Sequence, residues 1–391
     1  MRLFWFELKK IWKNRLCLPL LFILCVATAL LLLEENPKGA AGRRMAVSYL
    51  TRDFTFYASL TDSEKEGFRQ AMAEKYGEDV FDSYGVPDEA SLSPPGYFGE
   101  DQADFNYIYV VTTLTRFQNK IDEIQRSVVE AAKAFGRNAV REGNSYEIRR
   151  NLDVIRLYQK ARTPLTNEIR SWNRFLFTPY PVLLVLFAVF FLCSGIFSRE
   201  RDTNALVFLS TSANGKGKTA GAKYMASLVS VMLCYLLIRG VSLLTIAFNF
   251  GLSGWDQPVW GIEELSCCTH DLAVAQYVFL AMGCELVSVL IVSVLCTSIS
   301  ALSGSSVISF LVNALLLTGC AGLFFLEPRP ELLKGPLAFA APLRYFDSYY
   351  TANVLTYPIP WLPLHIILWG LLCAAVAFCS GRYFSRMREK L

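Results

Sequence analysis

Histidine is scarce in this sequence, and the residues that could form a catalytic or metal site do not form a recognisable one. Only two of the 391 residues are histidines, His270 and His365. Cys267, Cys268, His270 and Asp271 could in principle hold a metal, but no second ligand pair with zinc-site spacing follows. No serine, cysteine or aspartate lies in a hydrolase motif that we recognise. We therefore expect no catalytic residue, and no metal or cofactor bound by this chain.

A continuous polar stripe is missing from each of six long apolar blocks. Hydrophobic residues make up 53% of the chain, and each block is close to the ~20 apolar residues that a helix needs to cross a bilayer. A helix of a soluble protein would show a polar stripe, which these blocks lack. The expected fold class is an all-α integral membrane protein. We expect six transmembrane helices, at Leu16–Leu33, Pro179–Phe197, Tyr224–Phe248, Leu272–Leu302, Val307–Leu326 and Trp361–Phe384.

Lysine and arginine are absent from the segment between the third and fourth blocks, where acidic residues lie. They gather instead before the first block, between the second and third, and after the sixth. Because basic residues mark cytoplasmic loops, we expect both termini and the loop 198–223 to face the cytoplasm. Residues 34–177 would then lie outside the plasma membrane of a bacterial cell. The first block has no cleavage pattern at its end, so we expect it to stay as an anchor.

The outer segment also lacks cysteine: none of the 11 cysteines falls in 36–177. An exported domain that relied on disulfides would carry cysteine pairs, so we expect this domain to be held together by apolar packing. Apolar residues recur every three or four positions over Thr112–Phe135 and over Ile148–Ile169, which predicts two amphipathic helices. A turn within Gly136–Gly143 makes them an antiparallel hairpin. Ser63–Tyr76 is a shorter predicted helix.

The N-terminal sequence RLFWFELKKIWKN predicts a helix with separate apolar and basic faces. Its apolar face carries Phe4, Leu8, Ile11 and Trp12, while the lysines lie largely elsewhere. This pattern is typical of a helix that lies along the inner membrane surface, and we expect it over residues 1–15. The alternative is a charged segment that simply leads into the first span.

The stretch STSANGKGKTAGAK, residues 210–223, ends like a phosphate-binding loop. That motif needs a glycine where Ser212 stands, a strand before the loop and a helix after it. Neither the glycine nor a strand pattern is present. We therefore interpret the stretch as part of a basic cytoplasmic loop with a short helix that another protein could contact.

The segment IFSRERDTNALVFLSTSANGKGKTAGAKYMASL resembles the first cytoplasmic loop of ABC-2 type permeases, the membrane subunits of one branch of ABC exporters. The sequence lacks proline after Ser-Thr and has Asn204 where glycine is common in that family. The N-terminal helix resembles the family's elbow helix, and 327–360 resembles its re-entrant outer segment. An interfacial loop is the alternative for 327–360. The matching positions in the loop are Glu200, Leu206 or Leu209, Ser210-Thr211, Lys216 or Lys218, and Lys223.

The resemblance implies that the chain itself catalyses nothing. ATP and magnesium would be bound by a separate ATPase subunit, and residues 178–391 would form the permease core. A second permease subunit, identical or related, and the lipid bilayer would be the other partners, with no nucleic acid. A peptide, a lipid or an envelope substrate would be exported. The ATPase would dock on a coupling helix that includes Arg199, Glu200, Arg201, Asp202, Asn204, Leu206 and Leu209.

Two charged residues fall inside predicted spans, where charges are costly and are often functional. Glu285 lies near the middle of the fourth span, and it would either contact substrate or bond to a neighbouring helix. Arg239 lies nearer the outer end of the third span and could reach the interface. Counting the helical rise from each end places the two at different depths, so the sequence gives no ground for pairing them.

Two other functions fit parts of the sequence. In the first, the protein is a membrane-anchored sensor or scaffold whose outer helical domain binds a peptide or an envelope component. In the second, it is an ion-coupled secondary transporter. The second is disfavoured because the two halves show no inverted repeat and few charges lie within the spans.

Overall fold

A computed structural model describes most of the chain outside the region between the first two spans. The described residues are 2–13, 15–34, 102–159, 170–203, 215–252, 254–266, 268–325, 335–341, 343–346 and 349–386, with four single residues between 63 and 74. The predicted helix at Ser63–Tyr76 therefore lies largely outside the described residues, and so does part of 327–360.

Each of the six apolar blocks lies on a helix. In α8 the prolines stand at the first positions, where a missing N–H and a fixed φ are tolerated. The helices are α2 (Cys17–Glu34), α8 (Tyr180–Cys193), α11 (Gly215–Phe250), α12 (Val274–Leu302), α13 (Ser306–Phe325) and α15 (Trp361–Arg386). The shorter helices are α1 (Arg2–Trp12), α7 (Arg170–Phe177), α9 (Ser198–Asp202) and α14 (Leu343–Phe346).

Four helical stretches of the described residues are long and apolar enough to cross a membrane, and a fifth is formed if α1 and α2 count as one bent span. The four are 172–202, 217–249, 274–302 and 361–386. The axes of α1 and α2 differ by 63°, and α13 is a shorter apolar helix. The protein is thus a predominantly helical membrane protein with four or five candidate spans, and the count of six stays a prediction.

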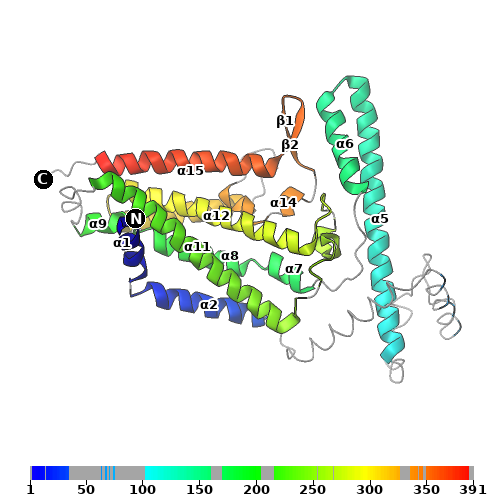
Figure 1. Cartoon of the computed structure of the whole chain (residues 1–391), viewed down its shortest axis with the longest axis horizontal. Helices are drawn as coiled ribbons and strands as arrows, with labels where there is room; N and C mark the ends of the chain where they lie inside the picture. Colours follow the sequence, from blue (N-terminus) through cyan, green and yellow to red (C-terminus); the bar gives the residue numbers. More distant parts are fainter. Residues whose placement is uncertain are drawn as a thin grey trace.

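The helices form an elongated bundle in which α11 and α12 contact most of the others (Figure 1). Helix α8 packs against both, α2 packs on α8 and α11, and α15 packs on α11 and α12. The short helices α1 and α9 lie at one end of the bundle, near the C-terminal end of α15 (Figure 1). Helix α7, the strands and the helices α5 and α6 lie at the opposite end.

The core changes character from one end of the bundle to the other. Between α8, α11 and α12 it is aliphatic, with Val189, Val231 and Val292 completely buried. Towards the end that carries α7 it becomes aromatic, with Trp172 and Trp260 completely buried. Branched aliphatic side chains let helices pack closely along their length, whereas the large rings fill the wider space where irregular segments join them.

The predicted antiparallel helix pair is present as α5 (Gln102–Glu142) and α6 (Ser145–Gln159) (Figure 1). The turn lies within the predicted Gly136–Gly143, but α5 extends beyond its predicted end at Phe135 and continues through Gly136. A single glycine lowers helix stability by only about 1 kcal/mol, and the chain turns only at Gly143, whose φ of 68° favours glycine. The last ten residues of the second predicted helix lie outside the described residues.

A small β-hairpin before α15 was not predicted and corrects the all-α expectation. Strands β1 (Thr351–Val354) and β2 (Tyr357–Pro360) pair antiparallel. Their two-residue turn places Leu355 and Thr356 at φ values of 49° and 71°, a region that side chains with a Cβ seldom adopt. Tyr146 of α6 donates a hydrogen bond of 2.9 Å to the first carbonyl of β1, so the hairpin is joined to the α5–α6 pair.

Candidate functional site

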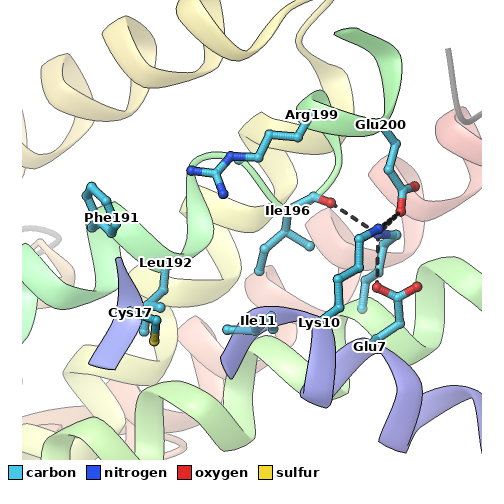
Figure 2. Close-up of a pocket in the computed structure, with 11 residues that line it drawn as sticks. Glu7, Lys10, Ile11, Cys17, Phe191, Leu192, Ile196, Arg199 and Glu200 are labelled. Carbon is cyan, nitrogen blue, oxygen red and sulfur yellow. Dashed lines mark hydrogen bonds and ion pairs between the residues drawn. The ribbon is translucent and has the colours of Figure 1, made fainter. Parts of the chain in front are cut away.

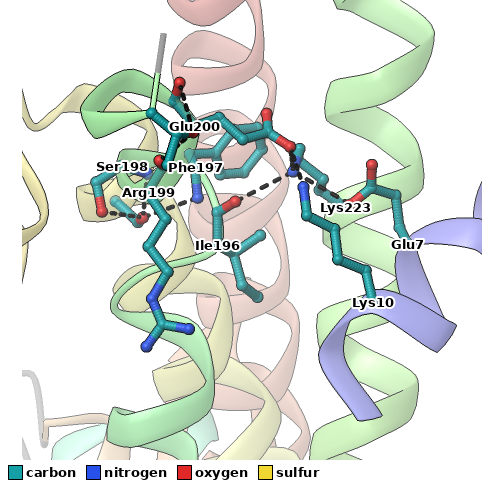
Figure 3. Close-up of polar contacts among 10 residues, drawn as sticks. Glu7, Lys10, Ile196, Phe197, Ser198, Arg199, Glu200 and Lys223 are labelled. Atoms are coloured by element: carbon teal, nitrogen blue, oxygen red, sulfur yellow. Dashed lines mark hydrogen bonds and ion pairs between the residues drawn. The ribbon is translucent and has the colours of Figure 1, made fainter. Parts of the chain in front are cut away.

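Four charged side chains meet where α1, α9 and α11 come together at one end of the bundle (Figure 3). We call Glu7, Lys10, Glu200 and Lys223 the charged cluster. Lys223 Nζ lies 3.2 Å from Glu7 Oε2 and 2.6 Å from Glu200 Oε1, and Lys10 Nζ lies 2.6 Å from the same Glu200 oxygen. The cluster joins three segments that are far apart in the sequence.

Lys223 is the centre of this cluster and is almost completely buried, with 1% of its surface exposed. Besides the two carboxylates, its ammonium donates a hydrogen bond of 3.1 Å to the carbonyl oxygen of Ile196. An ammonium group has three donors, and all three are used. The ring of Phe197, with its centroid 5.5 Å away, adds a further favourable contact for a cation. A buried charge is tolerated only with such complete pairing.

Helix α9 is positioned by hydrogen bonds from the end of α12. The first N–H groups of a helix have no partner within the helix, and here Ser300 Oγ accepts from the backbone N–H groups of Phe197 at 3.1 Å and Ser198 at 3.2 Å. At the other end of α9, Arg201 donates to the carbonyl oxygens of Ala301 and Ser303. These carbonyls belong to the last turn of α12 and the residue after it, where helices leave acceptors unpaired.

Asp202 joins α9 to the next helix in space. Its Oδ2 accepts from the backbone N–H of Ser306 at 3.2 Å and from the hydroxyl of the same residue. Ser306 is the first residue of α13, so the carboxylate caps that helix. Helix α9 is therefore fixed between the ends of α12 and α13.

The predicted docking residues differ in their accessibility. Glu200 is 4% exposed and is bound by Lys10 and Lys223 within the protein, and its role in contacting a partner stays a prediction. Arg201 is half-buried by its bonds to α12, whereas Arg199 and Asp202 are exposed. Docking itself stays a prediction. The remaining predicted positions, Asn204, Leu206 and Leu209, lie outside the described residues.

The predicted elbow segment is the helix α1, and its apolar face packs partly against the protein. Trp12 Nε1 donates a hydrogen bond of 3.2 Å to Ser230 of α11. Trp5 and Phe6 are the large side chains of α1 that remain more than 60% exposed. A role at the membrane surface stays a prediction. The four residues predicted for the apolar face, Phe4, Leu8, Ile11 and Trp12, are all half-buried.

A second buried charge pair, which the sequence did not predict, lies inside the bundle between Glu285 and Arg239. Arg239 Nη2 lies 2.7 Å from Glu285 Oε1, and both side chains are at most 2% exposed. Tyr235 donates a hydrogen bond of 3.0 Å to the other carboxylate oxygen. Arg239 also bonds the carbonyl of Phe175 at 3.3 Å and lies 4.4 Å above its ring. The depth count had ignored the length of the arginine side chain.

The glycine-lysine-threonine run that ends like a phosphate-binding loop is helical. Gly217, Lys218 and Thr219 lie within α11, which begins at Gly215. Thr219 is buried and Lys218 is exposed, so these residues do not form a loop that surrounds a phosphate. Across the described part of the chain, no three side chains of metal-ligand type lie together. The candidate ligand Cys267 is outside that part.

The fold and the charged cluster define a class, a helical membrane protein in which buried ions join α1, α9 and α11 at one end of the bundle. Comparison with protein-family models, with curated proteins and with solved structures found no match. Any more particular function must therefore be argued from the residues themselves.

Proposed function

We propose that this chain is the membrane permease subunit of an ABC exporter, moving a peptide, a lipid or an envelope substrate while a separate subunit hydrolyses ATP. The charged cluster is the observation that supports this most. It ties α9, in the loop that resembles a coupling loop, to α1 and to the start of α11. A push on α9 would therefore move three segments together.

The six apolar helices fit a permease core with α13 as the fifth span. Its 20 residues extend about 30 Å at the rise of an α-helix, which matches the hydrocarbon thickness of a bilayer. With six spans, both termini and α9 face the cytoplasm of a bacterial cell, as the basic residues favour. The α5–α6 pair then lies outside the cell. ATP and magnesium belong to the ATPase subunit, and a second permease subunit completes the exporter.

Co-purification tests the proposal. The tagged chain is expressed with the products of its neighbouring genes, and the complex is assayed for bound ATPase and ATP hydrolysis. We expect an ATPase subunit to co-purify, and the double variant Leu206→Asp with Leu209→Asp to release it. Leu355→Asp is the matched control, because Leu355 is 89% exposed at the opposite end of the bundle. A complex without any ATPase, or one that survives the double variant unchanged, contradicts the proposal.

The alternative function, a sensor or scaffold, is supported by exposed apolar side chains on the outer helix pair. Phe135 and Val140 of α5 are 65% and 64% exposed, and Leu152 of α6 is 49% exposed. Exposed apolar side chains can form part of a binding surface. A peptide or envelope component that co-purifies, with no ATPase in the complex, would favour this function over export.

A further inference from the structure

A pocket of about 250 Å³ lies beside the charged cluster, between α1, the start of α2, the end of α8 and α9 (Figure 2). Its walls have two chemically different parts. One part is charged and is built from the cluster together with Arg199. The other part is apolar and is lined by Ile11, Cys17, Phe191 and Leu192. A ligand that fills both parts must itself carry a charged and an apolar portion.

The charged part of the pocket holds one cation more than it has carboxylates. Lys10 and Lys223 are both paired with the carboxylates of the cluster. Arg199 is exposed and forms no ion pair with any residue that the structure describes. The unbalanced charge is therefore a guanidinium, which binds phosphate through two parallel hydrogen bonds.

Gly195 sets the direction of this guanidinium. A Cβ at Gly195 would lie 2.6 Å from Nε and 3.1 Å from Cδ of Arg199, so a larger residue here would displace the flexible arginine side chain from its place along the end of α8. The guanidinium consequently points away from the carboxylate of Glu200 and towards the side of the pocket that holds Phe191 and Leu192 (Figure 2). Arg199, which forms no ion pair with the described residues, thus lies next to the apolar wall.

We propose that this pocket binds the head of an anionic phospholipid, with the phosphate on Arg199 and the start of an acyl chain along Phe191 and Leu192. Basic pockets between helices at the membrane surface are suited to such head groups. The volume suits a head group and not a whole lipid or a nucleotide. A soluble phosphate would leave the apolar wall uncovered. The proposal rests on the location of the bundle in a membrane and not on ATP-driven transport.

Native mass spectrometry of the purified full chain tests the site. The protein in detergent is incubated with equal amounts of phosphatidylglycerol, phosphatidylethanolamine and phosphatidylcholine, and the retained lipids are counted. We expect phosphatidylglycerol to be retained about tenfold over phosphatidylcholine, a ratio typical of a charge-assisted bond. Arg199→Gln should abolish this preference. Arg382→Gln is the matched control, since Arg382 is an exposed arginine at the same end of the bundle that does not line the pocket.

Gly195→Ala distinguishes binding at a site of defined geometry from a general attraction of anionic lipids by positive charge. The variant keeps every charge but displaces the Arg199 side chain, so it should lower phosphatidylglycerol retention as Arg199→Gln does, while the unfolding midpoint shows that the protein is folded. Inorganic phosphate at millimolar concentration should not displace the lipid. Equal retention of the three lipids, unchanged retention in Gly195→Ala, or displacement by free phosphate would each overturn the proposal.

Discussion

Replacing Lys223 by methionine tests the charged cluster most directly. The change removes the ammonium whose three donors bind Glu7, Glu200 and a backbone carbonyl. It leaves two carboxylates that are each only 4% exposed. Removal of one partner from a buried ion pair destabilises a protein by about 3–5 kcal/mol, because the remaining charge has no compensation. We expect about 3 kcal/mol, since Lys10 still pairs with one of the two carboxylates.

The measurement is the free energy of unfolding of the purified protein in detergent, with two comparison variants. Lys10→Met should lose no more than about 1 kcal/mol, because the Lys10 side chain is 49% exposed and partly exposed pairs contribute little. Glu7→Gln combined with Lys223→Met should recover part of the loss, because one buried charge is then gone. The reasoning is refuted if Lys223→Met unfolds like the wild type, or if Lys10→Met is equally destabilised.

Three further predictions concern other parts of the molecule. Arg239→Met should lower the free energy of unfolding by about 3–5 kcal/mol, because it leaves Glu285 buried without its cation. The double variant with Glu285→Met should lie closer to the wild type. Equal losses of stability in the single and the double variant would contradict a stabilising interaction between the two residues. Burial lowers the pKa of His270 below its usual value of 6.5, so the native state holds the imidazole neutral, and stability present above pH 6.5 should be lost as the pH falls through the native pKa. Unfolding midpoints measured against pH should show this slope, and His270→Gln should flatten it; an identical slope in the variant would assign the effect to other groups. Leu355→Asn should slow amide exchange in the β-hairpin, by up to about 1 kcal/mol in opening free energy, because asparagine tolerates the left-handed conformation better than leucine does. The leucine side chain is exposed, so its loss should remove little packing. Faster exchange in the variant would refute the strain argument.

The presence of the helices could be predicted because each is marked by a local apolar pattern in the sequence. The residues at which the helices begin and end could not be predicted. An apolar block without interruption is helical in a membrane whatever surrounds it, and all six blocks are helical here. The errors came from treating each glycine as a break. Helix α11 begins at Gly215, before the predicted Tyr224, and α5 continues through Gly136. Neither glycine has a positive φ, and it is the positive φ of Gly143 that ends α5.

The candidate site could be predicted only in part because its bonds join residues that are distant in the sequence. The loop that holds Glu200 and Lys223 was recognised, but both were assigned to the surface. Glu7 was missed because it is 216 residues from Lys223, and no local pattern names a partner at that distance. An acidic residue flanked by apolar side chains on a short N-terminal helix was the available signal.

The two buried charge groups give α11 fixed contacts at two levels, and this constrains how the bundle can move. Near its start, Lys223 binds α1 and α9; about 24 Å further along its axis, Arg239 binds Glu285 of α12 and the carbonyl of Phe175 in α7. A continuous helix transmits displacement without breaking its own hydrogen bonds. Because α11 moves as one rigid helix, a shift of α9 would also displace Arg239. The Arg239–Glu285 pair must then slide, tilt or open in response. Because an unpaired charge there is so costly, tilting with the pair intact requires the least free energy. In a lipid environment that restores the stability of Lys223→Met, a shift of α9 should therefore no longer displace the Arg239–Glu285 pair.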